Sequence, residues 1–328
     1  MRVLMTGSHP YPLPAIGTGR NPKPLPSAAG QRVHDTIAKG LAKLGHDVRY
    51  FLTGELTGPP PAGVTIVDRM TDADIFHITV PRDEQRLREW NGPWVATCHV
   101  DLRTRGGVLP EAADQWIFVS RALAASHGKE RWVLNGIDPD DYLYSEQKGD
   151  YLLFLASIEW ALRKGLDLAL AAAREAGVRI VVAGTGRTAE QVELAASLCT
   201  SFGAEYAGDV QGEEKARLLA HARALILPTR INDACPLSIA EALASGTPVI
   251  ASANGGCPEL VSSDVGFICQ RFEDYVRAIR EAGSIAPAAC RAKAMSELHY
   301  LRMARDYVRE YENELVRFTS APSRSSSM

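Results

Sequence analysis

Several patterns that mark common protein classes are missing from this 328-residue chain. Its six cysteines are scattered without a CxxC pair, which indicates reduced, buried thiols rather than a disulfide framework or a zinc site. No apolar run is long enough to span a membrane, and no signal peptide precedes the first expected strand. The formal net charge of −3 gives no reason to expect nucleic acid or an anionic membrane as a partner. We therefore expect a cytoplasmic protein, with peripheral attachment to a membrane left open.

The signatures of several enzyme classes are also missing. The chain has no Gly-x-Ser-x-Gly, no P-loop ending in Gly-Lys-Ser/Thr and no HExxH. Gly184-Thr185-Gly186 follows an expected strand, as a dinucleotide-binding loop would. It lacks the third glycine and an acid about twenty residues later, so the sequence supports an oxidoreductase only weakly.

Strands and helices alternate through both halves of the chain. The strands expected in the first half are Arg2–Gly7, Val48–Leu52, Ile75–Val80, Trp94–Cys98, Trp116–Val119 and Trp132–Leu134. Those in the second half are Tyr151–Ala156, Val178–Ala183, Glu205–Ala207, Ala224–Leu227 and a buried strand at Val249-Ile250. The expected helices are Gln31–Leu44, one that starts at Arg121 after a Ser120 cap, Lys164–Ala176, Thr188–Cys199, Glu213–Ala220, one near Leu237, Phe272–Ala282, Pro287–Leu298 and Tyr300–Phe318.

This alternation predicts an α/β protein with two Rossmann-like, doubly wound parallel-sheet domains that face each other across a cleft. The length suits two domains of ordinary size. Ligands of such sheets bind beyond the carboxyl ends of the strands. The expected division is a first domain at 1–140, a linker at 141–149, a second domain at 150–299, a helix at 300–318 and a disordered tail at 319–328.

The segment Asp233–Glu259 contains the strongest functional pattern in the chain. It reads as a loop, a helix that starts near Leu237, a turn, a buried strand and a Gly-rich loop. The free N–H groups at the start of the helix can receive an anion. Glu241 lies about one turn further along, where a carboxylate can accept hydrogen bonds from two hydroxyls. A pyrophosphate and a ribose lie this far apart, so the segment predicts a seat for a nucleoside diphosphate.

The same segment resembles the retaining glycosyltransferases of family four, which have the GT-B fold. That family carries a Glu, seven residues and a second Glu, followed by an Ala-rich helix, G-x-P-V and a Gly-Gly-x-x-Glu loop. Here Glu241, Gly246–Val249 and Gly255–Glu259 match in order, and Asp233 replaces the first Glu.

Shorter motifs extend the resemblance into the first half. They are the G-H-x-V turn at Gly45–Val48, D-I-x-H at Asp74–His77, T-x-H at Thr97–His99, V-S at Val119-Ser120 and N-G-I-D at Asn135–Asp138. The family implies that the final helix, Tyr300–Phe318, crosses back onto the first domain.

The resemblance also implies a role for individual residues. It places the base near Gly184 and Val210, the ribose on Glu241, and the diphosphate on Lys164. The backbone at four further residues would hold the diphosphate: Cys235, Pro236, Leu237 and Ser238. His99 and Asp233 would contact the donor sugar, and Gly30 would approach its phosphate. The family's Arg is missing at Ser157, and Arg163 is the candidate to replace it. Asp72-Ala73-Asp74 has the D-x-D form of another, metal-dependent class, but it opens a strand toward His77, so we expect a structural role there.

The function implied is that of a retaining, metal-independent hexosyltransferase without a cofactor. It would move a sugar from a nucleotide-diphosphate sugar to the hydroxyl of an unidentified acceptor, which could be a small molecule, a glycan or a lipid-linked sugar. Two alternatives stay open from the residues alone. One is a nucleotide-sugar epimerase of the same fold, and the other is a non-catalytic nucleotide-sugar-binding protein, which the Asp at 233 and the missing Arg suggest.

Overall fold

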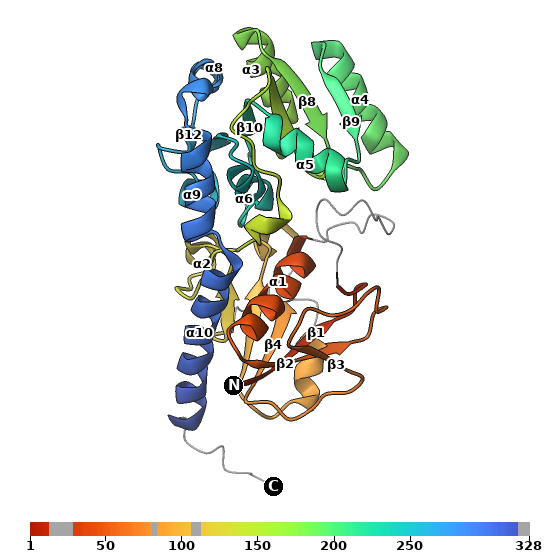
Figure 1. Ribbon diagram of the computed structural model, residues 1–328, viewed down its shortest axis with the longest axis vertical. Helices are drawn as coiled ribbons and strands as arrows, with labels where there is room; N and C mark the ends of the chain where they lie inside the picture. Colours follow the sequence, from red (N-terminus) through yellow and green to blue (C-terminus); the bar gives the residue numbers. More distant parts are fainter. Residues whose placement is uncertain (13–28, 81–83, 106–112, 321–328) are drawn as a thin grey trace.

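The computed structural model describes residues 1–12, 29–80, 84–105 and 113–320, and it contains two six-stranded sheets (Figure 1). The first consists of β1 (Arg2–Gly7), β2 (Asp47–Leu52), β3 (Val64–Val67), β4 (Ile75–Val80), β5 (Trp94–Cys98) and β6 (Trp116–Phe118). The second consists of β7 (Tyr151–Leu155), β8 (Arg179–Ala183), β9 (Glu205–Gly208), β10 (Ala224–Leu227), β11 (Val249–Ser252) and β12 (Gly266–Cys269).

The two sheets have the same topology. The first has the order β3-β2-β1-β4-β5-β6 and the second β12-β11-β10-β7-β8-β9, and every pairing between named strands is parallel. When each sheet is counted from its own first strand, both have the order 3-2-1-4-5-6 of a dinucleotide-binding fold. The predicted pair of doubly wound parallel sheets is therefore confirmed. The carboxyl ends of β1 and of β7 mark the places where each strand order reverses, and a ligand is expected there.

Helices cover both sheets. They are α1 (Ala29–Lys43), α2 (Arg121–Ser126), α3 (Leu166–Ala176), α4 (Ala189–Phe202), α5 (Gly212–His221), α6 (Leu237–Ala244), α7 (Cys257–Leu260), α8 (Phe272–Glu281), α9 (Pro287–Glu297) and α10 (Tyr300–Ser320). Ser120 caps α2 as expected, since its side chain accepts from the N–H of Leu123. No helix among the described residues is both long and apolar enough to cross a bilayer.

The last helix, α10, returns to the first half and packs on α1 (Figure 1). The two helices approach closely at Gly40, where a Cβ would lie 2.7 Å from Ala304 Cβ. Two tyrosines on α10, Tyr307 and Tyr311, are fully buried in the first half. The helix thus forms part of the core of the first half although it follows the second in the chain.

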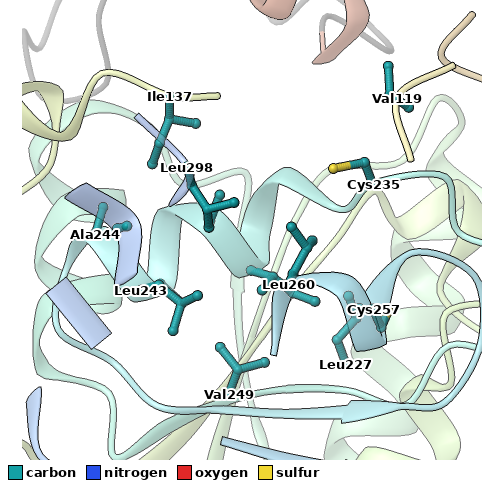
Figure 2. Packing of buried hydrophobic residues seen from close by; sticks show 14 of the residues in the cluster. Val119, Ile137, Leu227, Cys235, Leu243, Ala244, Val249, Cys257, Leu260 and Leu298 are labelled. Carbon is teal, nitrogen blue, oxygen red and sulfur yellow. The ribbon is translucent and has the colours of Figure 1, made fainter. Parts of the chain in front are cut away.

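The chain crosses between the halves at two places that lie side by side. The N–H of Ile137 donates to the carbonyl of Leu298 over 2.8 Å, and the N–H of Tyr300 donates back to Ile137 over 2.9 Å. Ile137 and Leu298 point toward Leu243 and Ala244 on α6 (Figure 2), and all four belong to one buried cluster that runs through both halves. The crossing is therefore packed onto the helix that carries Glu241.

Some expected elements differ from the structure. The helix expected at Lys164–Ala176 begins instead at Leu166, because Gly165 has a left-handed φ of +83° and a Cβ there would collide with the carbonyl of Pro228. Instead of a strand at Trp132–Leu134 there is an isolated bridge between Trp132 and Phe118. The short edge strands β3 and β12 were not predicted.

Two predictions concern segments that are only partly described. The helix expected to end at Phe318 continues to Ser320, so the tail predicted to be disordered from Thr319 begins in a helix. Its remainder, residues 321–328, and most of the Pro-rich loop expected at Ser8–Gly30 lie outside the described residues.

Candidate functional site

Glu241 lies in the middle of α6 and is 4% exposed. Five of the seven other residues of α6 are buried, so the helix has little room to turn the carboxylate toward water. An uncompensated carboxylate in such surroundings would cost several kcal/mol, so partners are required. Glu241 is therefore a buried acid and not a solvated surface residue.

Two side chains from other segments satisfy this carboxylate. The ammonium of Lys215, on α5, lies 2.9 Å from Oε1 and 2.8 Å from Oε2. The hydroxyl of Tyr142 donates to Oε1 over 3.3 Å. Burial and the nearby Glu241 charge raise the pKa of Tyr142, so its hydroxyl keeps its proton near neutral pH. Neither partner was predicted from the sequence.

Lys164 and Asp233, two of the predicted residues, form an ion pair. The ammonium of Lys164 and Oδ2 of Asp233 are in direct contact, and the side chains are 18% and 11% exposed. Asp233 is held by the Gly-rich loop, because the N–H of Gly256 donates to its carbonyl over 2.8 Å. Gly255 has a φ of +60°, and a Cβ there would collide with the Asp233 backbone. The Gly-Gly pair of the sequence motif therefore fixes the position of this acid.

Arg163 does not join this pair. It is exposed, its guanidinium lies 4.7 Å from the centroid of the Trp160 ring, and it forms no ion pair among the described residues. The loop that carries it is fixed by Arg230, whose N–H donates to the Arg163 carbonyl and whose guanidinium donates to Leu162 and Asp167. The hypothesis that Arg163 replaces the missing arginine stays a prediction that this conformation does not support.

The start of α6 follows the Asp233 loop directly. Pro236 occupies the cap position without a side-chain cap hydrogen bond, and the N–H of Ile239 donates to its carbonyl over 3.1 Å. The N–H groups of Leu237 and Ser238 have no carbonyl one turn earlier in the helix to bond. Cys235 precedes it, and its carbonyl accepts from the side-chain amide of Asn135 over 3.4 Å. Burial raises the pKa of the Cys235 thiol to about 12, so this neutral group adds no negative charge. The segment Cys235–Ser238 therefore keeps the anion-binding character expected from the sequence.

Gly184 and Val210 lie close together at the ends of neighbouring strands. The N–H of Gly184, just after β8, donates to the carbonyl of Gly208 over 2.8 Å, and Gly208 ends β9 two residues before Val210. Val210 is 3% exposed and belongs to the core, so its side chain is not available to a ligand. This strand edge also leads directly into α5 and Lys215.

On the first half, His99 and Gly30 are brought together. His99 follows β5, and a Cβ on Gly30 would lie 3.2 Å from Cδ2 of its ring. His77, one strand away, is fully buried and bonds Thr97 and Tyr311 over 2.7 Å each. Burial lowers the pKa of His77 to about 3, so this histidine is neutral and joins α10 to the sheet. Its structural role agrees with the expectation for that strand.

Two contacts connect the halves near these residues. The amide of Asn232, next to Asp233, donates to Asp101 over 2.9 Å. Glu259, the last residue of the Gly-Gly motif, accepts from the backbone N–H groups of Arg121 and Ala122 over 2.9 and 2.8 Å. A carboxylate of the second half thus caps α2 of the first.

A cavity of about 350 Å³ opens at the same interface. Its walls come from α1, from the segment after the crossing at Gly136 and from Leu237, the first residue of α6. Tyr142 lines this cavity and bonds Glu241 with its hydroxyl. The charged groups in the walls are Arg32, Asp35, Lys39, Asp138 and Asp141.

The Asp72-Ala73-Asp74 motif is tied to the first strand. The carboxylate of Asp74 accepts from the backbone N–H of Arg2 over 2.7 Å and from its guanidinium over 2.9 Å. No cluster of three or more potential metal ligands occurs among residues 1–12, 29–80, 84–105 and 113–320.

Sequence reasoning missed Lys215, Tyr142, the pair Asn232–Asp101 and the cap formed by Glu259. Lys215 and Tyr142 are 26 and 99 residues from Glu241, so no local spacing signals the contact. The only available signal was indirect, since a Glu within an Ala-rich helix requires a cation if it is buried.

Residues 149–283 match the family model for glycosyl transferases group 1. No curated protein sequence matches the chain.

Solved structures resemble the whole chain. AviGT4, a glycosyltransferase involved in avilamycin A biosynthesis, is 22% identical with a TM-score of 0.74, and 96% of this chain and 98% of that one are covered. Sucrose-phosphate synthase from Thermosynechococcus elongatus is 15% identical with a TM-score of 0.73, covering 96% and 99%. Anabaena Alr3699/HepE, solved in complex with UDP and glucose, is 14% identical with a TM-score of 0.68, covering 95% and 100%. Residues 149–283 thus form a group 1 glycosyltransferase domain, within a chain that as a whole has the GT-B fold of the glycosyltransferases.

Proposed function

We propose that this protein is a retaining glycosyltransferase of family four that transfers a hexose from a nucleoside-diphosphate sugar to an acceptor hydroxyl. The observation that carries the proposal is the buried carboxylate of Glu241, one turn inside a helix whose uncapped N-terminus adjoins Lys164 and Asp233. A carboxylate suited to hydroxyls and an N–H-rich helix end beside the Lys164 ammonium, suited to a diphosphate, therefore lie one helical turn apart. The complexes of Anabaena HepE with UDP-glucose and with UDP support this kind of donor.

The donor would lie along the carboxyl edge of the second sheet. Its base would contact the backbone near Gly184 and Val210, its ribose would bind Glu241, and its diphosphate would bind Lys164 and the first turn of α6. His99 and Gly30 face this edge from the first half in our assignment, and Asp233 contacts a hydroxyl of the donor sugar.

The chemistry we propose needs no side-chain base. The bond between the sugar C1 and the diphosphate oxygen breaks while the acceptor hydroxyl attacks the same face of the sugar. The departing phosphate oxygen takes the acceptor proton, so the products are the glycoside and a nucleoside diphosphate. Lys164 and the N–H groups of α6 stabilise the charge that develops on the diphosphate.

We further propose that the reaction is independent of metal, because Lys164 and the helix N-terminus supply the positive charge at the diphosphate. Transfer should then survive an excess of EDTA. Loss of transfer in EDTA that magnesium or manganese restores would contradict this part of the proposal and would give Asp72-Ala73-Asp74 or another acidic pair a role.

The assignment is tested in two stages. A thermal-shift panel of UDP, GDP, ADP, CDP and dTDP identifies the nucleotide, since a ligand that binds only the folded state raises the melting temperature. The corresponding nucleotide sugars are then incubated with and without acceptors. Transfer requires an acceptor and keeps the anomeric configuration of the donor. Release of an altered free sugar without acceptor would indicate an epimerase, and binding without turnover would indicate a non-catalytic binding protein.

A further inference from the structure

We propose that Lys215 is a positioning residue of the nucleotide site, which orients the Glu241 carboxylate so that its free acceptor position meets a ribose hydroxyl. The proposal rests on the function proposed above, because it presumes that Glu241 binds the ribose. It adds a residue that lies outside the segment Asp233–Glu259 and on a different helix.

The contact geometry restrains the carboxylate in two directions. Lys215 Nζ lies 2.9 Å from Oε1 and 2.8 Å from Oε2, so it contacts both oxygens at once. Tyr142 adds a donor to Oε1 alone. A carboxylate has about four acceptor positions, and these donors fill three of them. Among the described residues no further donor contacts the carboxylate, which leaves one acceptor position on Oε2 that we assign to a ribose hydroxyl.

Burial makes this arrangement necessary. The side chains of Glu241 and Lys215 are 5% and 16% exposed, so water cannot replace a lost partner readily. A charge-assisted bond between a buried carboxylate and a partly buried ammonium is shorter and stronger than a neutral one and holds both in place. Of its contacts with described residues, the carboxylate without Lys215 would keep the 3.3 Å bond from Tyr142, which restrains one oxygen and leaves rotation about the last side-chain bond free.

The position of Lys215 in the chain connects it to the rest of the proposed site. It belongs to the second turn of α5, which starts two residues after Val210, the residue assigned to the base. The strand edge that meets the base therefore leads into the helix that orients the ribose ligand, so base and ribose contacts are coupled through one short segment.

The test compares two ligands that differ only in the ribose. The nucleoside diphosphate that gives the largest thermal shift in the panel above is titrated by calorimetry beside its 2′,3′-dideoxy form. The wild-type protein should bind the natural ligand about 10-fold to 100-fold more tightly, the range expected for hydrogen bonds to a charged group. Lys215→Met should weaken the natural ligand about 10-fold and leave the dideoxy ligand within about 2-fold. Lys215→Arg should restore most of the lost preference.

Two further variants test whether the effect of Lys215→Met depends on its contact with Glu241. Arg217→Met removes a cation from the same helix, but Arg217 is exposed and pairs with Glu213 on the surface, so ribose preference should be unchanged. In a Glu241→Gln background, Lys215→Met should cause no further loss of preference, since the group that it orients is already changed. This double variant also avoids an unpaired buried carboxylate, should the single variant fold poorly.

The outcomes separate the inference from the proposed function. Equal weakening of both ligands by Lys215→Met would mean a general structural effect and would overturn the inference. Loss of ribose preference in Glu241→Gln but not in Lys215→Met would also overturn it, while the donor site would stand. If the wild-type protein does not distinguish the two ligands, or binds none of the panel, the ribose assignment of Glu241 is wrong and the inference falls with it.

Discussion

The two sheets have the same strand order, but the polar side chains that pack around them form different kinds of contact. In the first half, His77, Thr97, Tyr307 and Tyr311 form a buried network of neutral groups between the sheet and α10. In the second half, the polar groups form ion pairs, Lys164 with Asp233 and Lys215 with Glu241, at the edge where the strands end.

The difference follows from what covers each sheet. A helix that packs across the first sheet removes water from His77, so the neutral imidazole is favoured and its two nitrogens bond hydroxyls. The side chains of the second-half ion pairs are 5–18% exposed, whereas His77 is fully buried. In the first half the buried polar groups thus hold a helix, and in the second half they are the charged groups that we propose bind the donor.

The largest expected effect on ligand binding comes from removing the Glu241 carboxylate of the second half. Glu241→Ala should lower affinity for the nucleoside diphosphate about 10-fold to 100-fold, equivalent to about 1.5–3 kcal/mol. Calorimetric titration measures this, and circular dichroism checks that the fold is kept. Glu214→Ala, which removes an exposed acid from α5, serves as the control and should bind normally. An unchanged affinity in Glu241→Ala would show that Glu241 does not belong to a nucleotide site.

The ion pair Lys164–Asp233 should affect the affinity for the phosphates of the ligand and not the affinity for the nucleoside. Lys164→Met should weaken a nucleoside diphosphate by about 1.5 kcal/mol, or about 10-fold, because it loses a charge-assisted contact. The affinity for the corresponding nucleoside should not change. If the variant weakens nucleoside and diphosphate equally, Lys164 does not act on the diphosphate.

Asp233→Asn should affect nucleoside-diphosphate binding and sugar transfer differently. The ion pair occupies Lys164, so removal of the acidic charge should leave nucleoside-diphosphate binding equal or tighter. Transfer of the sugar should fall, because Asp233 is assigned to a sugar hydroxyl. Affinity and turnover are measured on the same variant. If Asp233→Asn lowers both the affinity for the nucleoside diphosphate and the turnover, the assignment of Asp233 to the sugar is wrong.

The neutral network of the first half predicts a pH effect on stability. Burial lowers the pKa of His77 from its ordinary 6.5 to about 3. Between about pH 3 and pH 6.5 the unfolded chain binds a proton at this position that the folded chain does not. The neutral His77 therefore does not lower the free energy of unfolding above pH 6.5. Below pH 6.5 the free energy of unfolding falls by about 1.4 kcal/mol per pH unit.

His77→Gln should therefore make the free energy of unfolding less dependent on pH between about 4 and about 6.5. Urea unfolding at several pH values measures the slope. His221→Gln, at an exposed histidine, is the control and should keep the wild-type slope. A slope that His77→Gln leaves unchanged would show that His77 does not stay neutral in the folded protein.

The smallest expected effect concerns the contact between the two halves. Glu259→Ala removes the carboxylate that caps α2 and should destabilise the protein by about 1 kcal/mol, the usual cost of a lost cap. Small-angle scattering should show a wider range of arrangements of the halves. Glu175→Ala, at an exposed acid on α3, should change neither measurement. If scattering and stability are unchanged in Glu259→Ala, the cap does not hold the halves together.

Local patterns allowed much of the fold to be predicted. The buried run at Val249-Ile250, the Ala-rich helix and the glycines around them each leave a signal within a few residues, and these elements are confirmed. The strand β3 (Val64–Val67) has four residues at the sheet edge, which is too short for a clear alternation. Lys164 was assigned to a helix because composition does not show that Gly165 must adopt a left-handed conformation.

The candidate site was less accessible to sequence reasoning, because its partners come from distant segments. Glu241 could be named from a motif, but the cation that pairs with it lies on another helix, and the phenol comes from the segment after the crossing. Arg163 was expected near the diphosphate, whereas its guanidinium lies over Trp160, a neighbour only three residues earlier. Such side-chain choices depend on packing, which a one-dimensional pattern does not contain.

The central claim is that the carboxyl edge of the second sheet holds a nucleoside diphosphate. The most direct test is a crystal structure of the protein with the nucleotide that the thermal-shift panel selects. Our account predicts a ribose hydroxyl within hydrogen-bond distance of Glu241 Oε2, and the diphosphate between Lys164 and the first turn of α6. A nucleotide bound elsewhere, with the pairs Lys215–Glu241 and Lys164–Asp233 untouched, would contradict it.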